Sequence, residues 1–411
     1  MVRFIGLDVH RDFAQIAVLQ DGEVRDAGQV ACRPDALVGW ARKLGPGDQV
    51  ALEATGNSEA IALLIRPYAG RVVVSNPLKT RAIAEAKVKT DKVDARILAQ
   101  LLAADFLPPV WLPDERTARL RRIVGQRTQL VRERTRIKNQ VHAVLARNLL
   151  PRPTATDLFG KAGRAWLGLQ VLPPDERDTV HALLRHLDFL GNELASYEQA
   201  LATEALTDAT ARRLMTIPGV STVVAMALIA AVGDFRRFPT AEKLVAYLGL
   251  HPRVRQSGGQ PAHHGRITKQ GNAHARGMLV EAAFTAALAP GPLRAFYSRI
   301  KARRGFQIAV VATARKLATL AWTLDTRGEE YAFARPSLVA FKQRKLELTS
   351  GAPRAVAHRG PGYAYNDKQL RREERELVET AERAYQLLIS NWQPRRPAGA
   401  KKIEFTRPRQ E

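Results

Sequence analysis

Four acidic side chains in the N-terminal part of the chain have the types and spacing to hold divalent cations. Asp91 and Asp94 stand three residues apart at the start of an apolar stretch predicted to be helical, so they share one helical face. Asp8 and Glu53 each end an apolar run typical of a strand. Close carboxylates repel one another unless a proton or a cation lies between them, and oxygen ligands suit hard cations such as Mg²⁺. We therefore predict a metal site, with Asp12 as the alternative to Asp8.

The elements that must position these acids alternate along the chain. Predicted strands span residues 2–9, 13–20, 23–30, 49–53 and 71–75. Predicted helices span residues 34–43 and about 58–68, and a further helix begins at Asn76-Pro77. Asp21-Gly22 is typical of the turn of a β-hairpin. The sequence thus predicts an α/β domain in its first hundred or so residues.

The overall charge indicates a polyanionic partner. The chain of 411 residues carries 64 Lys and Arg against 40 Asp and Glu, a net charge of +24. Such an excess favours DNA or RNA, although an Arg-rich codon bias also raises the count. The single Cys32 excludes an internal disulfide and a zinc finger. Without a membrane-length apolar run or a signal-peptide pattern, we expect a cytoplasmic protein of about two or three domains that binds no membrane.

The middle of the chain changes to long helical patterns. Residues 115–150 carry an apolar stripe, and a second helical run covers about residues 178–206, which together predict a helical hairpin or coiled-coil arm. The stripe is either core or a seam between subunits, and we favour the seam. The other faces of the first helix are rich in Arg, which favours phosphate contact over a merely solvated face. The candidate contacts are Arg121, Arg122, Arg127, Arg134 and Lys138.

A glycine turn and a serine-containing loop follow. Helical runs at 211–216 and 222–232 flank a turn at 217–221, which predicts a helix-hairpin-helix presenting Gly219 to a phosphate, or a plain packed hairpin. Residues 249–272 predict a loop or hairpin before a helix that ends near residue 288. Ser257 precedes two glycines, where backbone can approach a ligand closely, so we interpret this stretch as an anion site with a hydroxyl, or as an ordinary turn. The accompanying basic residues are Arg253, Arg255, Arg266, Lys269 and Arg276.

Taken as a set, the acids resemble a known family. Asp8, Glu53, Asp91 and Asp94 are similar to the D-E-D-D set of the DEDD transposases of bacterial insertion sequences, and Ser75-Asn76-Pro77 and residues 89–95 also resemble that family. The stretch around Ser257 is similar to the family's C-terminal domain, in which a serine ahead of such glycines is the nucleophile. Gln256 precedes it, so the motif holds no second candidate, and Ser221 is the fallback. The resemblance covers roughly residues 3–105 and 210–325.

The architecture implied by the resemblance is α/β plus mostly α. Residues 1–110 would form a ribonuclease H-like domain similar to RuvC, the Holliday-junction resolvase. Residues 111–207 would form the helical coiled-coil arm, and residues 208–330 the C-terminal transposase domain with the helix-hairpin-helix and the nucleophilic serine. Beyond the resemblance, residues 331–411 predict a basic tail: a linker at 351–364, a helix at 368–391, and a disordered end from 394 that is either solvated or in contact with nucleic acid.

The resemblance also implies a function. The protein would be a bacterial DNA recombinase, meeting the nucleoid when active, that cuts and rejoins donor and target DNA guided by a structured bridge RNA from the element. Asp8, Glu53, Asp91 and Asp94 would hold Mg²⁺, as two ions, with Mn²⁺ able to substitute. Ser257 would form a phosphoserine, losing its proton to a base such as His263 or His264 or by metal proximity. A homo-oligomer, a dimer or a dimer of dimers, would allow the site to form across two subunits.

Two other classes of protein remain compatible with the residues. A metal-dependent, structure-specific endonuclease would use the same carboxylates with water in place of Ser257. A non-catalytic nucleic-acid-binding protein would use only the basic surface, against which the intact acidic set argues. Loss of Asp8 should abolish cleavage by either enzyme, whereas loss of Ser257 should abolish it only in the recombinase. Metal-independent binding of nucleic acid without any cleavage would indicate the non-catalytic protein.

Overall fold

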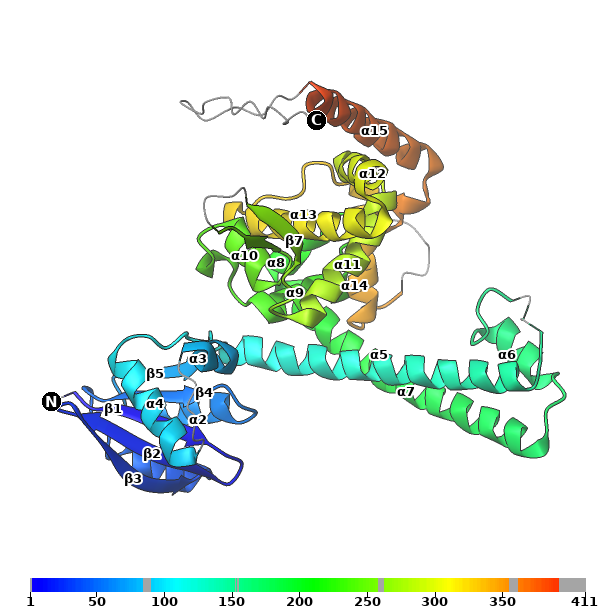
Figure 1. The fold of residues 1–411 in the computed structure, drawn as a ribbon. Coiled ribbons are helices and arrows are strands. Elements are labelled where there is room, and N and C mark those ends of the chain that lie inside the picture. Colours follow the sequence, from blue (N-terminus) through cyan, green and yellow to red (C-terminus); the bar gives the residue numbers. More distant parts are fainter. Residues whose placement is uncertain are drawn as a thin grey trace, which may run out of the picture. The chain divides into compact units, whose positions relative to one another are not determined.

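The computed structural model describes residues 2–83, 90–151, 153, 155–257, 262–354 and 361–391. The chain divides into two compact units, Met1–Asp114 and Glu115–Glu411, and each is described by itself (Figure 1). The first unit is a mixed sheet with helices, and the second is almost entirely helical. The fold class predicted from the sequence, α/β plus mostly α, is confirmed at this level. Within the described residues, no helix combines the length and the apolar character needed to cross a membrane.

Five strands make up the sheet of the first unit. They are β1 (Phe4–Val9), β2 (Phe13–Gln20), β3 (Glu23–Ala31), β4 (Gln49–Glu53) and β5 (Arg71–Ser75), in the spatial order β3-β2-β1-β4-β5. β1, β2 and β3 are antiparallel neighbours, whereas β4 runs parallel to both β1 and β5. Asp21 and Gly22 both adopt positive φ in the β2–β3 turn, as the Asp-Gly pair predicts. The carboxyl ends of β1, β4 and β5 therefore meet at one edge.

The two faces of this sheet are covered differently. Ile5, Leu7 and Val9 of β1 pack in one core with α1 (Pro34–Ala41) and α2 (Ser58–Ile65). On the other face, Ala51 packs with Leu98 of α4 (Asp91–Ala103). A Cβ built on Gly6 would lie 2.0 Å from the carbonyl oxygen of Ala95, so α4 can cross β1 this closely only because residue 6 is glycine. α3 (Pro77–Ile83) follows β5.

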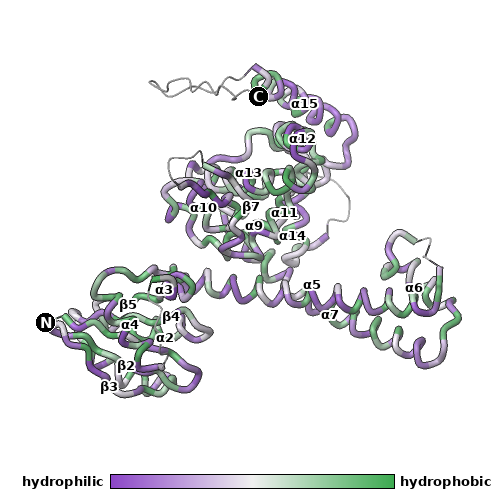
Figure 2. The backbone as a smooth tube through the Cα atoms, in the orientation of Figure 1, coloured by the Kyte–Doolittle hydropathy of each residue, from purple (hydrophilic) through white to green (hydrophobic). Residues whose placement is uncertain are grey.

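Two long helices form an antiparallel hairpin in the second unit. α5 (Glu115–Arg147) and α7 (Pro174–Thr207) pack along each other, joined through α6 (Lys161–Gly168), and Figure 2 shows hydrophobic and hydrophilic residues interleaved along both. Ile137 packs with Leu187, and Val144 packs with Val180. The predicted seam between subunits is wrong for most of this stripe, because six of its nine residues are buried within one chain: Leu120, Val124, Ile137, Val141, Val144 and Leu145.

The rest of the second unit surrounds one apolar helix. Every residue of α9 (Thr222–Val232) from Val224 onward is buried. Around it lie α8 (Ala209–Met215), α10 (Ala241–Tyr247), α11 (Ala273–Leu288), α12 (Pro292–Arg304) and α13 (Phe306–Arg327), with the short 3-10 helix η1 (Phe235–Arg237). β6 (Pro252–Arg255) and β7 (His263–Ile267) form a separate two-stranded antiparallel hairpin. The helical runs predicted around residue 217 and before residue 288 are confirmed.

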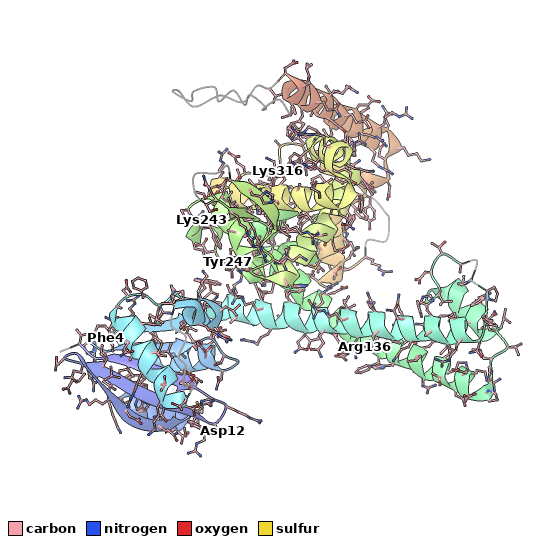
Figure 3. All side chains as sticks on the ribbon, in the orientation of Figure 1. Phe4, Asp12, Arg136, Lys243, Tyr247 and Lys316 are labelled. Atoms are coloured by element: carbon pink, nitrogen blue, oxygen red, sulfur yellow. The ribbon has the colours of Figure 1, made fainter. Side chains whose placement is uncertain are left out.

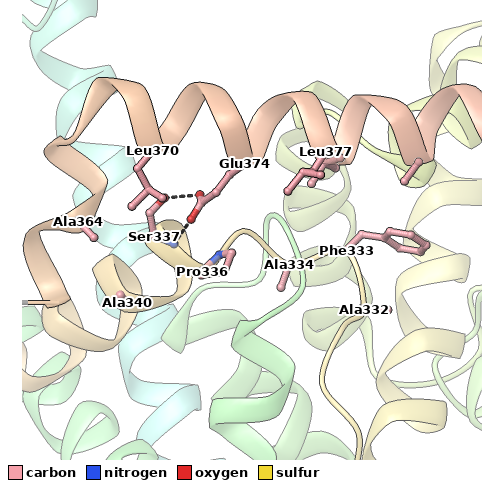
Figure 4. Close-up of a pocket in the computed structure, with 12 residues that line it drawn as sticks. Ala332, Phe333, Ala334, Pro336, Ser337, Ala340, Ala364, Leu370, Glu374 and Leu377 are labelled. Carbon is pink, nitrogen blue, oxygen red and sulfur yellow. Dashed lines mark hydrogen bonds between the residues drawn. The ribbon is translucent and has the colours of Figure 1, made fainter.

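The segment predicted as a tail holds two helices that pack on this core. α14 (Pro336–Thr349), which the sequence did not predict, places Leu346 in the same hydrophobic cluster as α9. α15 (Lys368–Ser390), which the sequence did predict, follows the 3-10 helix η2 (Pro361–Asn366). The buried Glu374 of α15 accepts hydrogen bonds from the backbone N–H of Ser337 at 2.8 Å and from its hydroxyl, beside an apolar pocket (Figure 4). Residues 392–411 lie outside the described part of the chain.

Candidate active site

Strand register places Asp8 and Glu53 side by side. β1 and β4 are parallel, and Leu7 pairs with Leu52, so each acid comes one residue later on its strand. Gly6 and Ala51, two residues before the acids, face α4. Because side chains alternate between the faces of a strand, both carboxylates belong to the α4 face of the sheet at its carboxyl edge. The sequence prediction that two strand ends present these acids together rests on this register.

The first turn of α4 supplies the other two acids. The hydroxyl of Thr90 caps the helix by accepting a hydrogen bond from the N–H of Val93 at 3.3 Å. Asp91 and Asp94 then stand in the first turn, where the positive end of the helix dipole stabilises negative charge. Lys92, between the two acids in sequence, forms an ion pair with Asp26 of β3 at 2.8 Å. Capping, dipole and ion pair together fix where α4 begins.

Three side chains converge where this turn meets the end of β1. One oxygen of Asp8, one oxygen of Asp91 and a ring nitrogen of His10 all lie within 4.8 Å of one another. His10 Nε2 is 3.2 Å from Asp8 Oδ2 and 3.3 Å from Asp91 Oδ2. His10 was not predicted as a site residue, although its place two residues after Asp8 could have signalled it. Asp12, the alternative to Asp8, lies exposed in the β1–β2 turn (Figure 3).

The electrostatics of the site favour a cation. Burial raises the pKa of the Asp8 carboxyl, and the negative charges of Asp94 and Asp91 raise it further, while His10 opposes the shift. Asp94 is therefore close enough to interact with Asp8, although it lies outside the three-atom group. Repulsion among these carboxylates would be relieved by a divalent ion, and two carboxylate oxygens with an imidazole nitrogen are a donor set that fits one. The residues present are thus compatible with a metal centre.

Ser75 extends the acidic row by one strand. It pairs with Glu53 in the parallel register of β4 and β5, so Asp8, Glu53 and Ser75 lie in one row at the carboxyl ends of three neighbouring strands. Ser75 is fully buried, and its hydroxyl has no hydrogen-bond partner among the described residues. The chain then turns into α3 through Asn76, whose N–H donates to the carbonyl oxygen of Pro108 at 2.9 Å. From the sequence, Ser75-Asn76-Pro77 was predicted only as a segment that resembles the family.

Ser257 lies in a different kind of surrounding. It is exposed and follows β6 by two residues, and residues 258–261 lie outside the described residues. Arg253, Arg255 and Arg266 are exposed on the same hairpin, and Lys269 has a φ of 57° just beyond it. Arg276 instead donates from Nη1 to the carbonyl oxygen of Leu248 at 3.1 Å. The structure thus places an exposed hydroxyl on a hairpin that also carries three exposed arginines.

The turn at residues 217–221 is fixed from two sides. Gly219 has a φ of 83°, and a Cβ there would lie 2.2 Å from the carbonyl oxygen of Ala282 in α11. On the other side, the ammonium of Lys342 donates to the carbonyl oxygens of Met215, Ile217 and Val220 at 2.7, 2.9 and 2.9 Å. Packing thus explains the glycine, and phosphate contact by Gly219 stays a prediction.

Ser221, the fallback nucleophile, has a local structural role. Its hydroxyl accepts a hydrogen bond from the N–H of Val224 at 3.4 Å and caps α9.

Most of the basic residues predicted to bind nucleic acid on α5 have partners within the chain. Arg121 donates to the carbonyl oxygens of Ala230 and Ala231, at 2.9 and 3.2 Å, at the end of α9. Arg127 forms an ion pair with Glu198. Arg122 pairs with Glu115, and Lys138 lies over the ring of Phe159. Phosphate contact by these residues and by Arg134 stays a prediction. Arg136, labelled in Figure 3, is exposed on the same helix.

Comparison with known proteins places this architecture in a family. The model of the Transposase IS116/IS110/IS902 family matches residues 211–298, and that of a DEDD-type IS110 transposase matches residues 5–148. The transposase for insertion sequence element IS1328 of Yersinia enterocolitica is 27% identical over 286 residues, covering 68% of this chain and 84% of that protein. A probable family 20 transposase of Pseudomonas aeruginosa is 27% identical over 339 residues, covering 79% and 96%.

Another relative is named for a rearrangement of DNA. The pilin gene-inverting protein of Moraxella bovis is 28% identical over 285 residues, covering 66% of this chain and 78% of that protein. An α/β unit with an acidic edge, a helical unit after it, and these matches define a transposase, which acts on DNA. The chain belongs to the IS110 family of DEDD transposases.

Proposed function

We propose that this transposase is a Mg²⁺-dependent recombinase that cuts and rejoins DNA through a covalent phosphoserine, guided by an RNA of its element. The observation that carries the proposal is the convergence of Asp8 and Asp91 at the carboxyl edge of the sheet, beside Glu53. The strand order β3-β2-β1-β4-β5, with β1, β4 and β5 parallel, supports a ribonuclease H-like, RuvC-like assignment of the first unit.

The carboxylates of the first unit would hold the metal. Asp8, Glu53, Asp91 and Asp94 are its proposed ligands, for two Mg²⁺ ions that Mn²⁺ can replace. Bound there, the ions supply neutralisation of the scissile phosphate and of the charge that develops on the leaving oxygen. Asp8 is the central ligand in this proposal, because it is more buried than Asp91 and its charge interacts with those of both Asp91 and Asp94.

Ser257 is the proposed nucleophile of the second unit. Its oxygen forms a bond to phosphorus while the bond from phosphorus to the 3′ oxygen of the DNA breaks. The serine proton leaves to solvent or to a base such as His263, and the departing 3′ oxygen takes up a proton. Attack by the 3′ hydroxyl of another strand reverses these changes, so the number of phosphodiester bonds is conserved and no ATP is needed. The reaction requires the carboxylates and Ser257 to act on the same phosphate.

Base pairing by RNA would supply the sequence specificity of this reaction. A protein guided in this way binds backbone and shape while the RNA pairs with donor and target DNA. The net charge of +24 supports binding of several polyanionic strands at once. We propose a homo-oligomer, a dimer or a dimer of dimers, as the active form, because donor and target must be held together. The buried stripe between α5 and α7 does not supply its interface.

A cleavage assay tests the proposal. Wild-type protein, Ser257→Ala and Ser196→Ala are incubated with Mg²⁺, donor and target duplexes, and RNA transcribed from the DNA flanking the gene. Ser196 is an exposed serine on α7, so its variant is the matched control. We expect Ser257→Ala to lose strand cutting and Ser196→Ala to keep it. Full cutting by Ser257→Ala would contradict the serine assignment and indicate an endonuclease that uses water.

A further inference from the structure

The three-atom group at the end of β1 has the spacing of ligands around one ion. His10 Nε2 lies 3.2 Å from Asp8 Oδ2 and 3.3 Å from Asp91 Oδ2. Two ligand atoms each about 2.1–2.2 Å from one metal ion, and at right angles around it, are about 3 Å apart. The distances from the imidazole nitrogen to both oxygens therefore match adjacent positions of one coordination sphere.

One contact holds the backbone of His10 and another holds its ring. Asn57 Nδ2 donates to the backbone carbonyl oxygen of His10 at 3.0 Å, which ties the end of β1 to the start of α2. The imidazole packs on the ring of Phe13, with 5.0 Å between centroids. Nε2 is screened from solvent and makes no hydrogen bond of regular geometry to a described residue. A nitrogen that is fixed, screened and without such a bond, beside two carboxylates, is poised to accept a metal.

We propose that His10 is a nitrogen ligand of the same metal that Asp8 and Asp91 bind, so that this site prefers Mn²⁺ to Mg²⁺. The proposal rests on the proposed function, because it adds a histidine to the proposed carboxylate site. Mg²⁺ takes oxygen ligands and dehydrates reluctantly, whereas imidazole suits first-row transition ions. An all-oxygen site would discriminate less between the two ions than a site with one nitrogen.

A competing role for His10 is that of a cationic bridge. A protonated imidazole between Asp8 and Asp91 would produce the same distances and would be displaced when a metal binds. The two roles predict opposite effects of replacing His10. Loss of a ligand weakens Mn²⁺ binding, whereas loss of a competing cation strengthens the binding of Mn²⁺ and Mg²⁺ alike.

The test uses full-length protein loaded with Mn²⁺ or Mg²⁺ alone. His10→Gln keeps a side chain of similar reach but offers oxygen in place of nitrogen, and His181→Gln on the exposed face of α7 is the matched control. Affinities are measured by calorimetry. We expect His10→Gln to lower the preference for Mn²⁺ over Mg²⁺ by about tenfold, and His181→Gln to leave it unchanged. An unchanged preference, or tighter binding of both ions by His10→Gln, would overturn the proposal.

A spectroscopic signature provides a second readout. Electron spin echo modulation of bound Mn²⁺ reports directly bonded nitrogen, so wild type and His181→Gln should show nitrogen modulation that His10→Gln lacks. Asp8→Asn separates the failure of this inference from that of the proposed function. If Asp8→Asn abolishes Mn²⁺ binding but wild type shows no nitrogen modulation, the carboxylate site stands and the role of His10 is refuted. If Asp8→Asn leaves Mn²⁺ binding intact, both proposals fail.

Discussion

The edge of the sheet that carries Asp8 and Glu53, and the β6–β7 hairpin that carries Ser257, both resemble the same family. The two regions differ in how firmly packing holds their side chains. Asp8 is half-buried at the end of a strand, held by register with β4 and by the close crossing of α4 at Gly6. Ser257 is exposed two residues after β6, on a hairpin that also carries the exposed Arg253, Arg255 and Arg266. The first site is fixed by packing, whereas the side chain proposed for the second is exposed to solvent. Substitutions should therefore separate chemistry from stability at the hairpin more cleanly than at the sheet.

Removing the charge of Asp8 should produce the largest effect on activity. We expect Asp8→Asn to lower the rate of strand cleavage by about a thousandfold or more, because a metal ligand is lost. Asp12→Asn, in the exposed β1–β2 turn, is the matched control and should cleave normally. Cleavage rates on the same DNA and RNA decide the outcome. Wild-type rates in Asp8→Asn with loss of rate in Asp12→Asn would exchange the roles of the two acids.

The same substitution should stabilise the metal-free fold. Burial and neighbouring acids raise the pKa of Asp8, so the folded state binds this proton more tightly than the unfolded state. The stability that this carboxyl contributes falls as pH rises from its ordinary pKa through the raised one. In chelator at neutral pH, Asp8→Asn should therefore raise the midpoint of urea unfolding of the protein. A lower midpoint would contradict the assigned electrostatics.

Lys342 should be a sensitive position for the stability of the second unit. Lys342→Met leaves three turn carbonyls without their donor, which we expect to cost about 3 kcal/mol of unfolding free energy. Lys345→Met, exposed on the same helix, should change it by less than about 0.5 kcal/mol. Urea unfolding of the two variants gives the comparison. Equal effects of the two substitutions would show that the turn does not depend on Lys342.

The pH dependence of this contact follows from burial, which lowers the pKa of Lys342 to about 8. Between about pH 8 and the ordinary lysine value of 10.5, the unfolded state holds a proton that the folded state has released. Stability contributed by Lys342 therefore rises with pH through this window. The difference in unfolding free energy between wild type and Lys342→Met should be larger at pH 9.5 than at pH 7.5. A difference that shrinks would contradict the direction of the shift.

Gly6→Ala should have a smaller effect, which lowers both the stability of the first unit and the rate of cleavage. Its Cβ would meet the carbonyl oxygen of Ala95, so we expect about 2 kcal/mol of destabilisation and a shift of α4 that also weakens cleavage. Gly39→Ala, in the exposed part of α1 with no atom near its Cβ, should be neutral or slightly stabilising. Urea unfolding and cleavage rates are measured for both. If Gly6→Ala matched Gly39→Ala, the close crossing would not position the acids.

Much of the fold followed from local patterns. The strands, the Asp-Gly turn, and the two long helices were predicted within a few residues, because apolar periodicity and turn residues act locally. α14 was missed because its burial depends on distant partners: Leu346 fits the α9 core, and Lys342 reaches the turn near Gly219. The seam between subunits was wrong because periodicity alone does not say which surface covers an apolar stripe.

The candidate site was predicted in part for the same reason. Asp8 and Asp91 could be paired from strand ends and helix starts, but the approach of His10 depends on where α4 crosses the sheet. Ser75 became part of the acidic row only through the register of β4 and β5. The carboxylates of the site can be predicted from residue types and spacing. Which imidazole or hydroxyl lies beside them depends on tertiary packing. Ser257 stays a prediction that rests on its resemblance to the family motif.

Isolation of a covalent protein–DNA adduct tests the central claim most directly. Wild-type protein, Asp8→Asn and Ser257→Ala are incubated with Mg²⁺, guide RNA, and donor and target duplexes, then denatured and separated by gel. The account predicts an adduct in wild type only, with the DNA phosphate mapped by mass spectrometry to Ser257. Cleaved DNA without an adduct, or an adduct at another residue, would contradict phosphoserine recombination.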